Sequence, residues 1–285
     1  MKEIFARAGT EEQLDALLDE RLADSVIISC GARISDELVC RAGACGMNIY
    51  IQLPDVLREN TLKEASSLLE KAAQYSGAVI ENIDELGMII ARDFRGRVIA
   101  DSFLYASNRE AVSFYLKYLK AADQCEDHPM FIANDELTGA ELGDLEKSSG
   151  ADLIFKAYGC QKLMVTAQDI AKANGAAGGS LKFENASGDH FFSELNKEFG
   201  YTCIYNSVPT YIPEYLNAHR ARAGSAYSSD KVTDLGRHHE QEKVSYVAEK
   251  VLFDFTRESR AEVIAVMNGS YGGPAVRGHF LKGTD

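Results

Sequence analysis

The chain has 285 residues, of which 46% are hydrophobic, so it can bury a sizeable core and a disordered chain is excluded. Its 30 basic and 43 acidic residues give a net charge of −13, which disfavours sequence-independent binding to nucleic acid. No stretch approaches the ~18 consecutive apolar residues of a membrane span and the first residues lack the apolar core of a signal peptide, so we expect a cytoplasmic protein without a membrane partner.

Short apolar runs that do not alternate with polar residues recur along the chain, separated by amphipathic helical patterns. Such runs are typical of parallel strands buried on both faces. We predict strands at residues 4–6, 25–29, 48–53, 78–80, 98–100, 130–133 and 153–155, with helices at 11–22, 61–73 and 108–119 among them. A further strand is predicted at 251–255, before a helix at 260–267. This alternation favours a single TIM-like (β/α) barrel over residues 1–285, with a doubly wound open sheet as the alternative.

Residues 161–245 interrupt the alternation. They contain a glycine-rich loop signal at 175–179, β-like segments at 181–183 and 202–205, and a polar, charged stretch at 218–243. We predict an irregular, β-containing insertion before the last strand. Because the loops after barrel strands lie at the catalytic face, this insertion is expected to cover the barrel mouth.

Polar residues that directly follow the predicted strands are expected at the same mouth, where they could form an acid–base and anion-binding set. Each could instead cap a helix or solvate a loop, and Asp135 in particular fits the N-cap of the next helix. The candidates for the mouth are Glu81, Asn82, Asp101, Asn134, Glu136, Tyr158, Thr256 and Glu258, with Arg277 and His279 near the C-terminus.

No signature of a metal or cofactor site is present. His238, His239 and Glu240 are adjacent, so their side chains point apart, and we interpret them as a solvated loop. The sequence contains no glycine-rich phosphate loop, HExxH or GxSxG motif. Its six cysteines form no CxxC pair and are expected to be free thiols. We therefore predict neither a metal nor a cofactor.

Three blocks are more specific than this general pattern. They are Tyr-Gly-Cys-Gln-Lys-Leu-Met-Val-Thr-Ala-Gln at 158–168, Ile-Tyr-Asn-Ser-Val-Pro at 204–209 and Arg-Gly-His-Phe-Leu-Lys-Gly at 277–283. In order and approximate spacing they resemble segments of the C-terminal half of the collagenase-like peptidases of family U-thirty-two. Weaker similarity at 101–111 and 253–258 extends the resemblance over residues 76–285. The resemblance implies a peptidase whose catalytic mechanism is unassigned.

Relatives in that family hydroxylate RNA bases or a quinone precursor without oxygen, and hold an iron–sulfur cluster with four cysteines. This chain departs from them. Cys160 stands where the family has arginine, and Cys203 falls at an ordinary apolar position. The positions that would supply the cluster ligands carry no cysteine: they are Asp169, residues 174–176, and Phe199 with Gly200. The resemblance thus predicts a member that lacks the cluster.

Three functions remain open. A degenerate, non-catalytic subunit would partner a cluster-bearing homologue. An oxygen-independent RNA or quinone hydroxylase is the least consistent with the missing ligands and the acidic charge. A peptidase would use Glu258 and His279 as its catalytic pair, and would bind a peptide or small-molecule substrate through Asp101, Glu136, Tyr158, Asn206 and Arg277.

Overall fold

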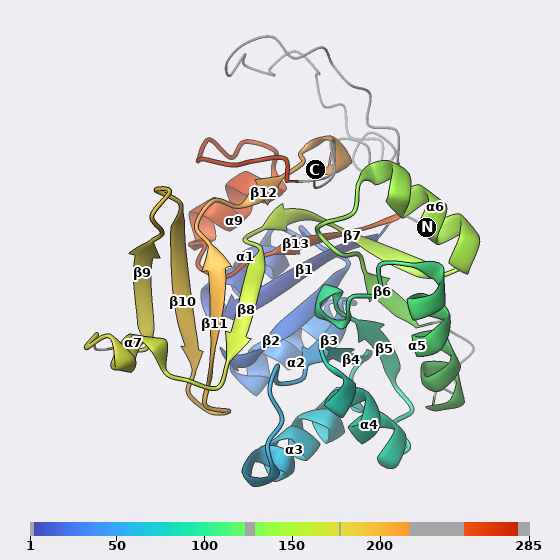
Figure 1. Ribbon diagram of the computed structural model, residues 1–285. Coiled ribbons are helices and arrows are strands. Elements are labelled where there is room, and N and C mark those ends of the chain that lie inside the picture. The colour runs from blue at the N-terminus through green and yellow to red at the C-terminus, as the bar shows by residue number, and fades with distance from the viewer. Residues whose placement is uncertain (1–2, 123–128, 177, 217–247, 279–285) are drawn as a thin grey trace.

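The computed structural model describes residues 3–122, 129–176, 178–216 and 248–278 (Figure 1). Parallel strands follow one another around a closed barrel, and the last of them completes it by pairing with both the seventh and the first. The predicted TIM-like barrel is therefore confirmed, and the open sheet is excluded. The strands, in order around the barrel, are β1 (Glu3–Thr10), β2 (Ser25–Arg33), β3 (Asn48–Gln52), β4 (Gly77–Ile80), β5 (Arg97–Ala100), β6 (Met130–Ile132), β7 (Asp152–Gly159) and β13 (Lys250–Asp254).

Helices surround the barrel on its outer face (Figure 1). Several begin with a capping box, in which the N-cap side chain and the third helical residue satisfy each other's backbone amides, as at Asn82 and Glu85. Among the described residues, no helix is both long and apolar enough to cross a bilayer. The helices are α1 (Glu11–Asp19), α2 (Asp36–Ala44), α3 (Leu62–Ala72), α4 (Ile83–Ala91), α5 (Arg109–Ala122), α6 (Gly139–Ser149) and α9 (Arg260–Met267), with 3-10 turns η1 (Glu59–Thr61) and η2 (Ser102–Leu104).

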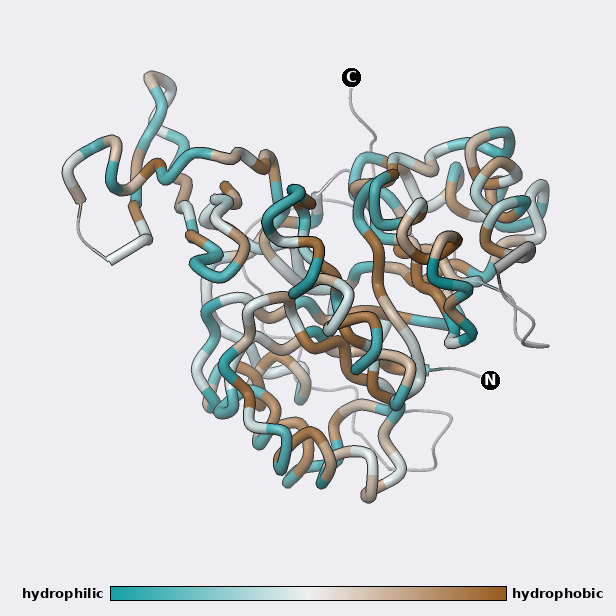
Figure 2. The backbone as a smooth tube through the Cα atoms, turned by 90° about the horizontal axis from the view of Figure 1, so that it is seen from below, coloured by the Kyte–Doolittle hydropathy of each residue, from teal (hydrophilic) through white to brown (hydrophobic). Residues whose placement is uncertain are grey.

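The hydrophobic core has two parts because each barrel strand is buried on both faces. The larger part lies between the barrel and its helices. Hydrophobic segments are concentrated in the barrel strands, and hydrophilic ones in the outer loops (Figure 2). The smaller part fills the inside of the barrel and consists of Phe5, Ile27, Tyr50, Val79, Ile99, Met130, Ile132, Ile154 and Leu252.

The insertion between β7 and β13 contains a small antiparallel sheet that stands beside the barrel (Figure 1). Its strands have the order β8, β11, β10, β9, and the predicted β-containing insertion is thus confirmed. The chain then returns to the barrel, where β12 (Thr210–Tyr211) pairs antiparallel with β7. The elements of the small sheet are β8 (Lys162–Thr166), α7 (Ile170–Ala173), β9 (Ser180–Glu184), β10 (His190–Asn196) and β11 (Tyr201–Asn206).

Candidate functional site

A layer of polar side chains lies directly above the apolar residues inside the barrel. Successive inward-facing residues of a strand are two positions apart, so the residues two beyond the apolar layer also point toward the barrel axis, at the mouth. Most of them are charged, and most are buried. They are Arg7, Ser29, Gln52, Glu81, Asp101, Asn134, Lys156 and Asp254.

Above this layer is a cavity of about 640 Å³, open at the carboxyl ends of the strands. The insertion supplies one wall of the cavity through Glu194 and Asn196 of β10 and Tyr201 and Cys203 of β11. The volume lies in the range of roughly 300–1,000 Å³ that is typical of small-ligand sites. A substrate held there would touch both the barrel and the small sheet.

Arg7 is held between two carboxylates on the floor of the cavity. It is 8% exposed, and its Nη1 donates to Asp254 at 3.0 Å while its Nη2 donates to Asp101. Burial acts to raise the pKa of Asp101, but the charges of Arg7 and Lys162 and the hydrogen bonds from Arg7 and Ser102 together outweigh it, and the pKa is lowered. The buried Nε of Arg7 has no hydrogen-bond partner among the described residues. It is an unsatisfied buried donor of a residue that lines the cavity.

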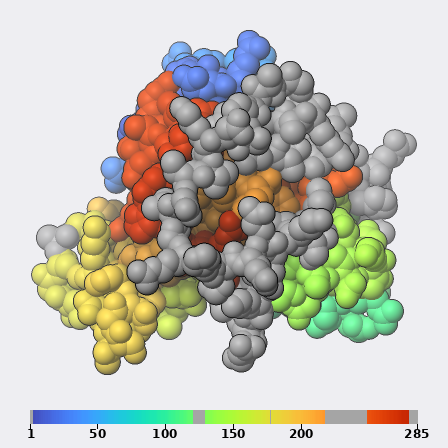
Figure 3. All heavy atoms as spheres, turned by 90° about the horizontal axis from the view of Figure 1, so that it is seen from above, coloured from blue at the N-terminus to red at the C-terminus, as the bar shows by residue number. Residues whose placement is uncertain are grey.

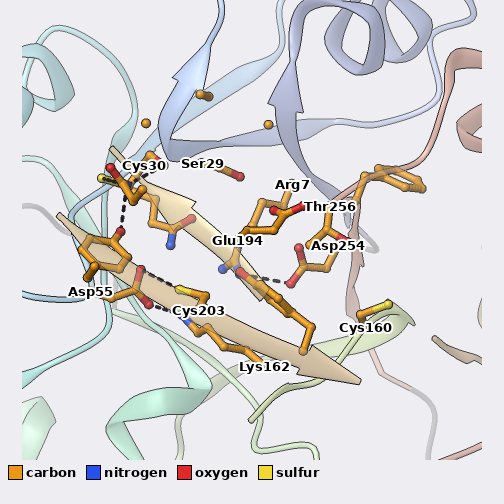
Figure 4. Close-up of a pocket in the computed structure, with 18 of the residues that line it drawn as sticks. Arg7, Ser29, Cys30, Asp55, Cys160, Lys162, Glu194, Cys203, Asp254 and Thr256 are labelled. Carbon is orange, nitrogen blue, oxygen red and sulfur yellow. Dashed lines mark hydrogen bonds and ion pairs between the residues drawn. The ribbon is translucent and has the colours of Figure 1, made fainter. Parts of the chain in front are cut away.

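Lys162 joins the small sheet to the barrel across the same cavity. Its ammonium group, at the start of β8, pairs with Asp55 and Glu81, and Gln52 donates to Glu81 at 2.7 Å. Figure 4 shows Lys162, Asp55 and Cys203 grouped together in the pocket. Burial acts to raise the pKa of Asp55, but the Lys162 charge and the hydrogen bonds from Glu81, Lys162 and Tyr201 together outweigh it, so the pKa is lowered. Burial and the Asp55 charge raise the pKa of Glu81. Asp55 is therefore ionised, whereas Glu81 keeps its proton to a higher pH than an ordinary glutamate does.

Asp135 is not the helix cap that its sequence position suggested. The N-cap of α6 is Thr138, whose hydroxyl accepts from the backbone of Glu141 at 3.2 Å. Asp135 instead lines the cavity and forms an ion pair with Lys156. The prediction failed because α6 begins at Gly139, so its N-cap falls three residues beyond Asp135. The carboxylate pairs with the ammonium of the neighbouring strand instead.

The Asp135–Lys156 pair is partly exposed, and the pKa values of both side chains are shifted. The side chain of Asp135 is 20% exposed, and that of Lys156 is 8% exposed. Burial raises the pKa of Asp135 despite the attraction of Lys156. Burial acts to lower the pKa of Lys156, but the Asp135 and Asp254 charges outweigh it, and the pKa is raised. Carboxyl groups of one site whose pKa values are pushed apart, such as Asp101 and Asp135, are typical of acid–base chemistry.

The other predicted site residues lie in several places. Tyr158 and Glu258 are joined by a hydrogen bond of 2.9 Å, and they line a second cavity beside the mouth. Glu136 is exposed and lies outside the lining of the mouth cavity. Asn206 accepts a hydrogen bond from the backbone of Gln161 at 2.6 Å, which connects β8 to β11. Of the predicted mouth residues that the structure describes, Asp101 and Thr256 line the mouth cavity.

The C-terminal candidates do not join the mouth in the described part of the chain. Arg277 forms an exposed ion pair with Glu214. His279, which was paired with Glu258 in the predicted catalytic set, lies outside the described residues. The solvated loop predicted at 238–240 also lies outside them. The prediction for His279 stays a prediction.

Most polar residues of the mouth were not predicted from the sequence, because the prediction considered residues that follow the strands and not residues within them. Arg7, Lys156 and Asp254 belong to β1, β7 and β13, and Gln52 is the last residue of β3. Counting two residues beyond each inward-facing apolar residue would have found all four. Lys162 carries no such signal, because it reaches the mouth from the insertion.

The residues at the expected cluster positions do not fit an iron–sulfur cluster. The two segments do come together, because Arg58 donates to the carbonyls of Ala167 at 3.1 Å and Gly200 at 3.2 Å. The guanidinium group of Arg58 therefore lies between the two segments, and Asp169 is the N-cap of α7. Such clusters require thiolate ligands, and none is supplied by Asp169, Phe199 or Gly200.

The cysteines of the mouth are thiols. Burial raises the pKa of Cys160 to about 12, and burial also raises that of Cys203. The five described cysteines form no disulfide, as predicted, and Cys125 lies outside the described residues. Within the described ranges, no group of three or more His, Cys, Asp and Glu side chains is arranged to hold a metal ion.

The chain matches no protein-family model, no curated protein and no solved structure.

Proposed function

We propose that this chain is a hydrolase of the collagenase-like peptidase family U-thirty-two that cleaves an amide bond of a peptide in the barrel mouth. The family part of the proposal rests on the three sequence blocks at 158–168, 204–209 and 277–283. The reaction rests on one observation: Asp135, a partly accessible carboxyl of raised pKa, is paired with the buried ammonium of Lys156 in the wall of the cavity.

In its ionised form Asp135 accepts a proton from a water molecule, whose oxygen forms a bond to the amide carbon. Negative charge then develops on the carbonyl oxygen. It is stabilised by the Lys156 ammonium and by the Nε–H of Arg7, which has no partner among the described residues. Asp135 returns the proton to the amide nitrogen as the C–N bond breaks. Proton transfer is thereby assigned to Asp135 and not to Glu258, which faces the second cavity.

The remaining charges of the mouth hold the substrate and keep the reacting groups in place. Arg7 is fixed by Asp101 and Asp254, and Lys162 is fixed by Asp55 and Glu81. Because these groups are already paired and buried, they need little reorganisation when charge develops nearby. The uncharged Oε1 of Gln52 is buried without a partner among the described residues and offers an acceptor for a backbone N–H of the peptide.

A mixed-sequence peptide library tests this proposal. The wild-type chain is expected to generate new peptide termini, detected by mass spectrometry. Asp135→Asn removes the base, and should slow cleavage by roughly 100-fold or more. Asp144→Asn is the matched control, since Asp144 is an exposed carboxylate on α6 outside the cavity lining. Absence of cleavage by the wild type, or equal rates for the Asp135→Asn variant and the wild type, would contradict the proposal.

A second candidate function is a non-catalytic subunit that partners a cluster-bearing homologue. It is favoured by the Arg58 contacts to Ala167 and Gly200, which connect the two segments where cluster ligands are expected. Affinity purification of the tagged chain from its own host should then recover a cysteine-complete homologue in equal amount, and the chain alone should cleave no peptide. Cleavage by the isolated chain would decide against this function.

A further inference from the structure

A second cavity, of about 760 Å³, lies beside the mouth. One of its sides is formed by Phe183 of β9 and by Phe191 and Phe192 of β10. The other is formed by residues 256–258 and by Tyr271 and Pro274 after α9. Figure 3, seen from above, shows the small sheet next to α9 and the segment that follows it. The volume again falls within roughly 300–1,000 Å³, so the cavity can hold a ligand group.

The side formed by the small sheet carries aromatic rings where β9 and β10 pair, with Phe183 and Phe191 on one face of the sheet and Phe192 on the other. Phe183 and Phe191 stack with their centroids 5.6 Å apart and an interplanar angle of 24°. Phe192 stacks on Tyr205 at 5.0 Å and 17°, and the guanidinium of Arg257 lies 3.6 Å from its centroid. An aromatic pair in an offset-stacked or edge-to-face arrangement gains free energy beyond that of the area it buries. The wall therefore favours an aromatic occupant.

The two cavities adjoin. Cys160 and Thr256 line both of them. The hydroxyl of Thr256 is buried without a hydrogen-bond partner among the described residues, so it can bind a polar atom of a molecule that passes between the cavities. Tyr158 and Glu258 close the polar end of the second cavity with their mutual hydrogen bond. One extended molecule can thus occupy both spaces.

The geometry points to the second cavity as a specificity pocket that binds an aromatic side chain of the peptide cleaved in the mouth. This inference rests on the proposed function, because it takes the substrate to be a peptide. The mouth, with its charged floor, holds the amide bond, while the ring wall selects the neighbouring residue. Among peptides, those with phenylalanine, tyrosine or tryptophan beside the cleaved bond are the preferred class.

Binding of two small probes tests the pocket. N-acetyl-phenylalanine methylamide and N-acetyl-alanine methylamide are titrated by NMR into the full chain carrying Asp135→Asn, which prevents turnover. The phenylalanine probe should bind more tightly. Adding Phe183→Ala, a half-buried ring of the wall, should weaken it by about threefold to tenfold and leave the alanine probe nearly unchanged. Phe191→Ala, which removes the stacking partner, is the second variant and should act in the same way.

The matched control is Phe114→Ala, which removes a ring that is 46% exposed on α5 and does not line the cavity. Equal affinity for the two probes, or an equal effect of the Phe114 and Phe183 substitutions, would overturn the pocket. If the phenylalanine probe binds tightly but no peptide is cleaved, the aromatic pocket is supported and the proposed peptidase function is contradicted. If peptides are cleaved without preference for aromatic residues, the peptidase function is supported and the aromatic pocket is contradicted.

Discussion

Replacing Arg7 by methionine should destabilise the protein strongly and in a pH-dependent way. Arg7 is 8% exposed and neutralises Asp101 and Asp254, so the substitution leaves two buried carboxylates without their shared cation. Figure 4 shows Arg7 beside Asp254 in the pocket. Removing one partner of a buried ion pair costs about 3–5 kcal/mol, which is a large part of the roughly 5–15 kcal/mol stability of a typical domain. Methionine keeps most of the apolar stem, so lost packing contributes little.

The pH dependence follows from Asp101. In the wild type its pKa is lowered because Arg7, Lys162 and the hydrogen bonds to Asp101 together outweigh burial. These interactions therefore contribute stability above the unfolded pKa of about 3.9, and this stability is lost as the pH falls through the lower, folded pKa. Without Arg7, burial acts on Asp101 unopposed by its nearest cation and raises the folded pKa. Protonation then favours the folded state, so the deficit of the variant should shrink on acidification from about pH 7 to about pH 4.

Urea denaturation followed by circular dichroism, repeated across that pH range, measures this difference. Arg41→Met is the matched control, because Arg41 forms an exposed ion pair with Asp15 and its loss should cost less than about 1 kcal/mol. A loss for Arg7→Met no larger than that of the control, or a deficit that stays constant with pH, would refute the reasoning that the mouth is a desolvated charge network.

Three further predictions concern the mouth and its supports. Arg58→Ala should expose the sheet–barrel connection at Ala167 and Gly200 to faster hydrogen exchange, whereas Arg58→Lys should restore only part of the protection because lysine lacks the planar fork. Gly159→Ala should destabilise by about 1–3 kcal/mol in thermal unfolding, since Gly159 has φ of +142° and an added Cβ would lie 2.8 Å from the Asp254 backbone oxygen; Gly87→Ala, in open space on α4, should be neutral or stabilising. The rate of peptide cleavage should fall on acidification at a higher pH than for an ordinary aspartate, because the pKa of Asp135 is raised and its ionised form is the base; a rate that falls only below about pH 4 would contradict this assignment.

Part of the site was visible in the sequence, and the part that was missed has a common cause. Asp101 was found because it follows β5 directly. Arg7 and Lys156 were not, because a charged residue within an apolar strand looks like an interruption of the strand. Asp135 was found but assigned to a helix cap, since capping depends only on local sequence whereas its ion pair with Lys156 depends on the neighbouring strand.

The sequence by itself determined the barrel and the place of its insertion. Short apolar strands alternating with amphipathic helices have few ways to bury both strand faces, and a closed parallel barrel is one of them. Only the tertiary structure decided which charges meet. Lys162 is distant in sequence from Asp55 and Glu81, yet pairs with both, because the small sheet folds back against the mouth. Burial then shifts the pKa values of these groups, and burial is a property of the assembled fold.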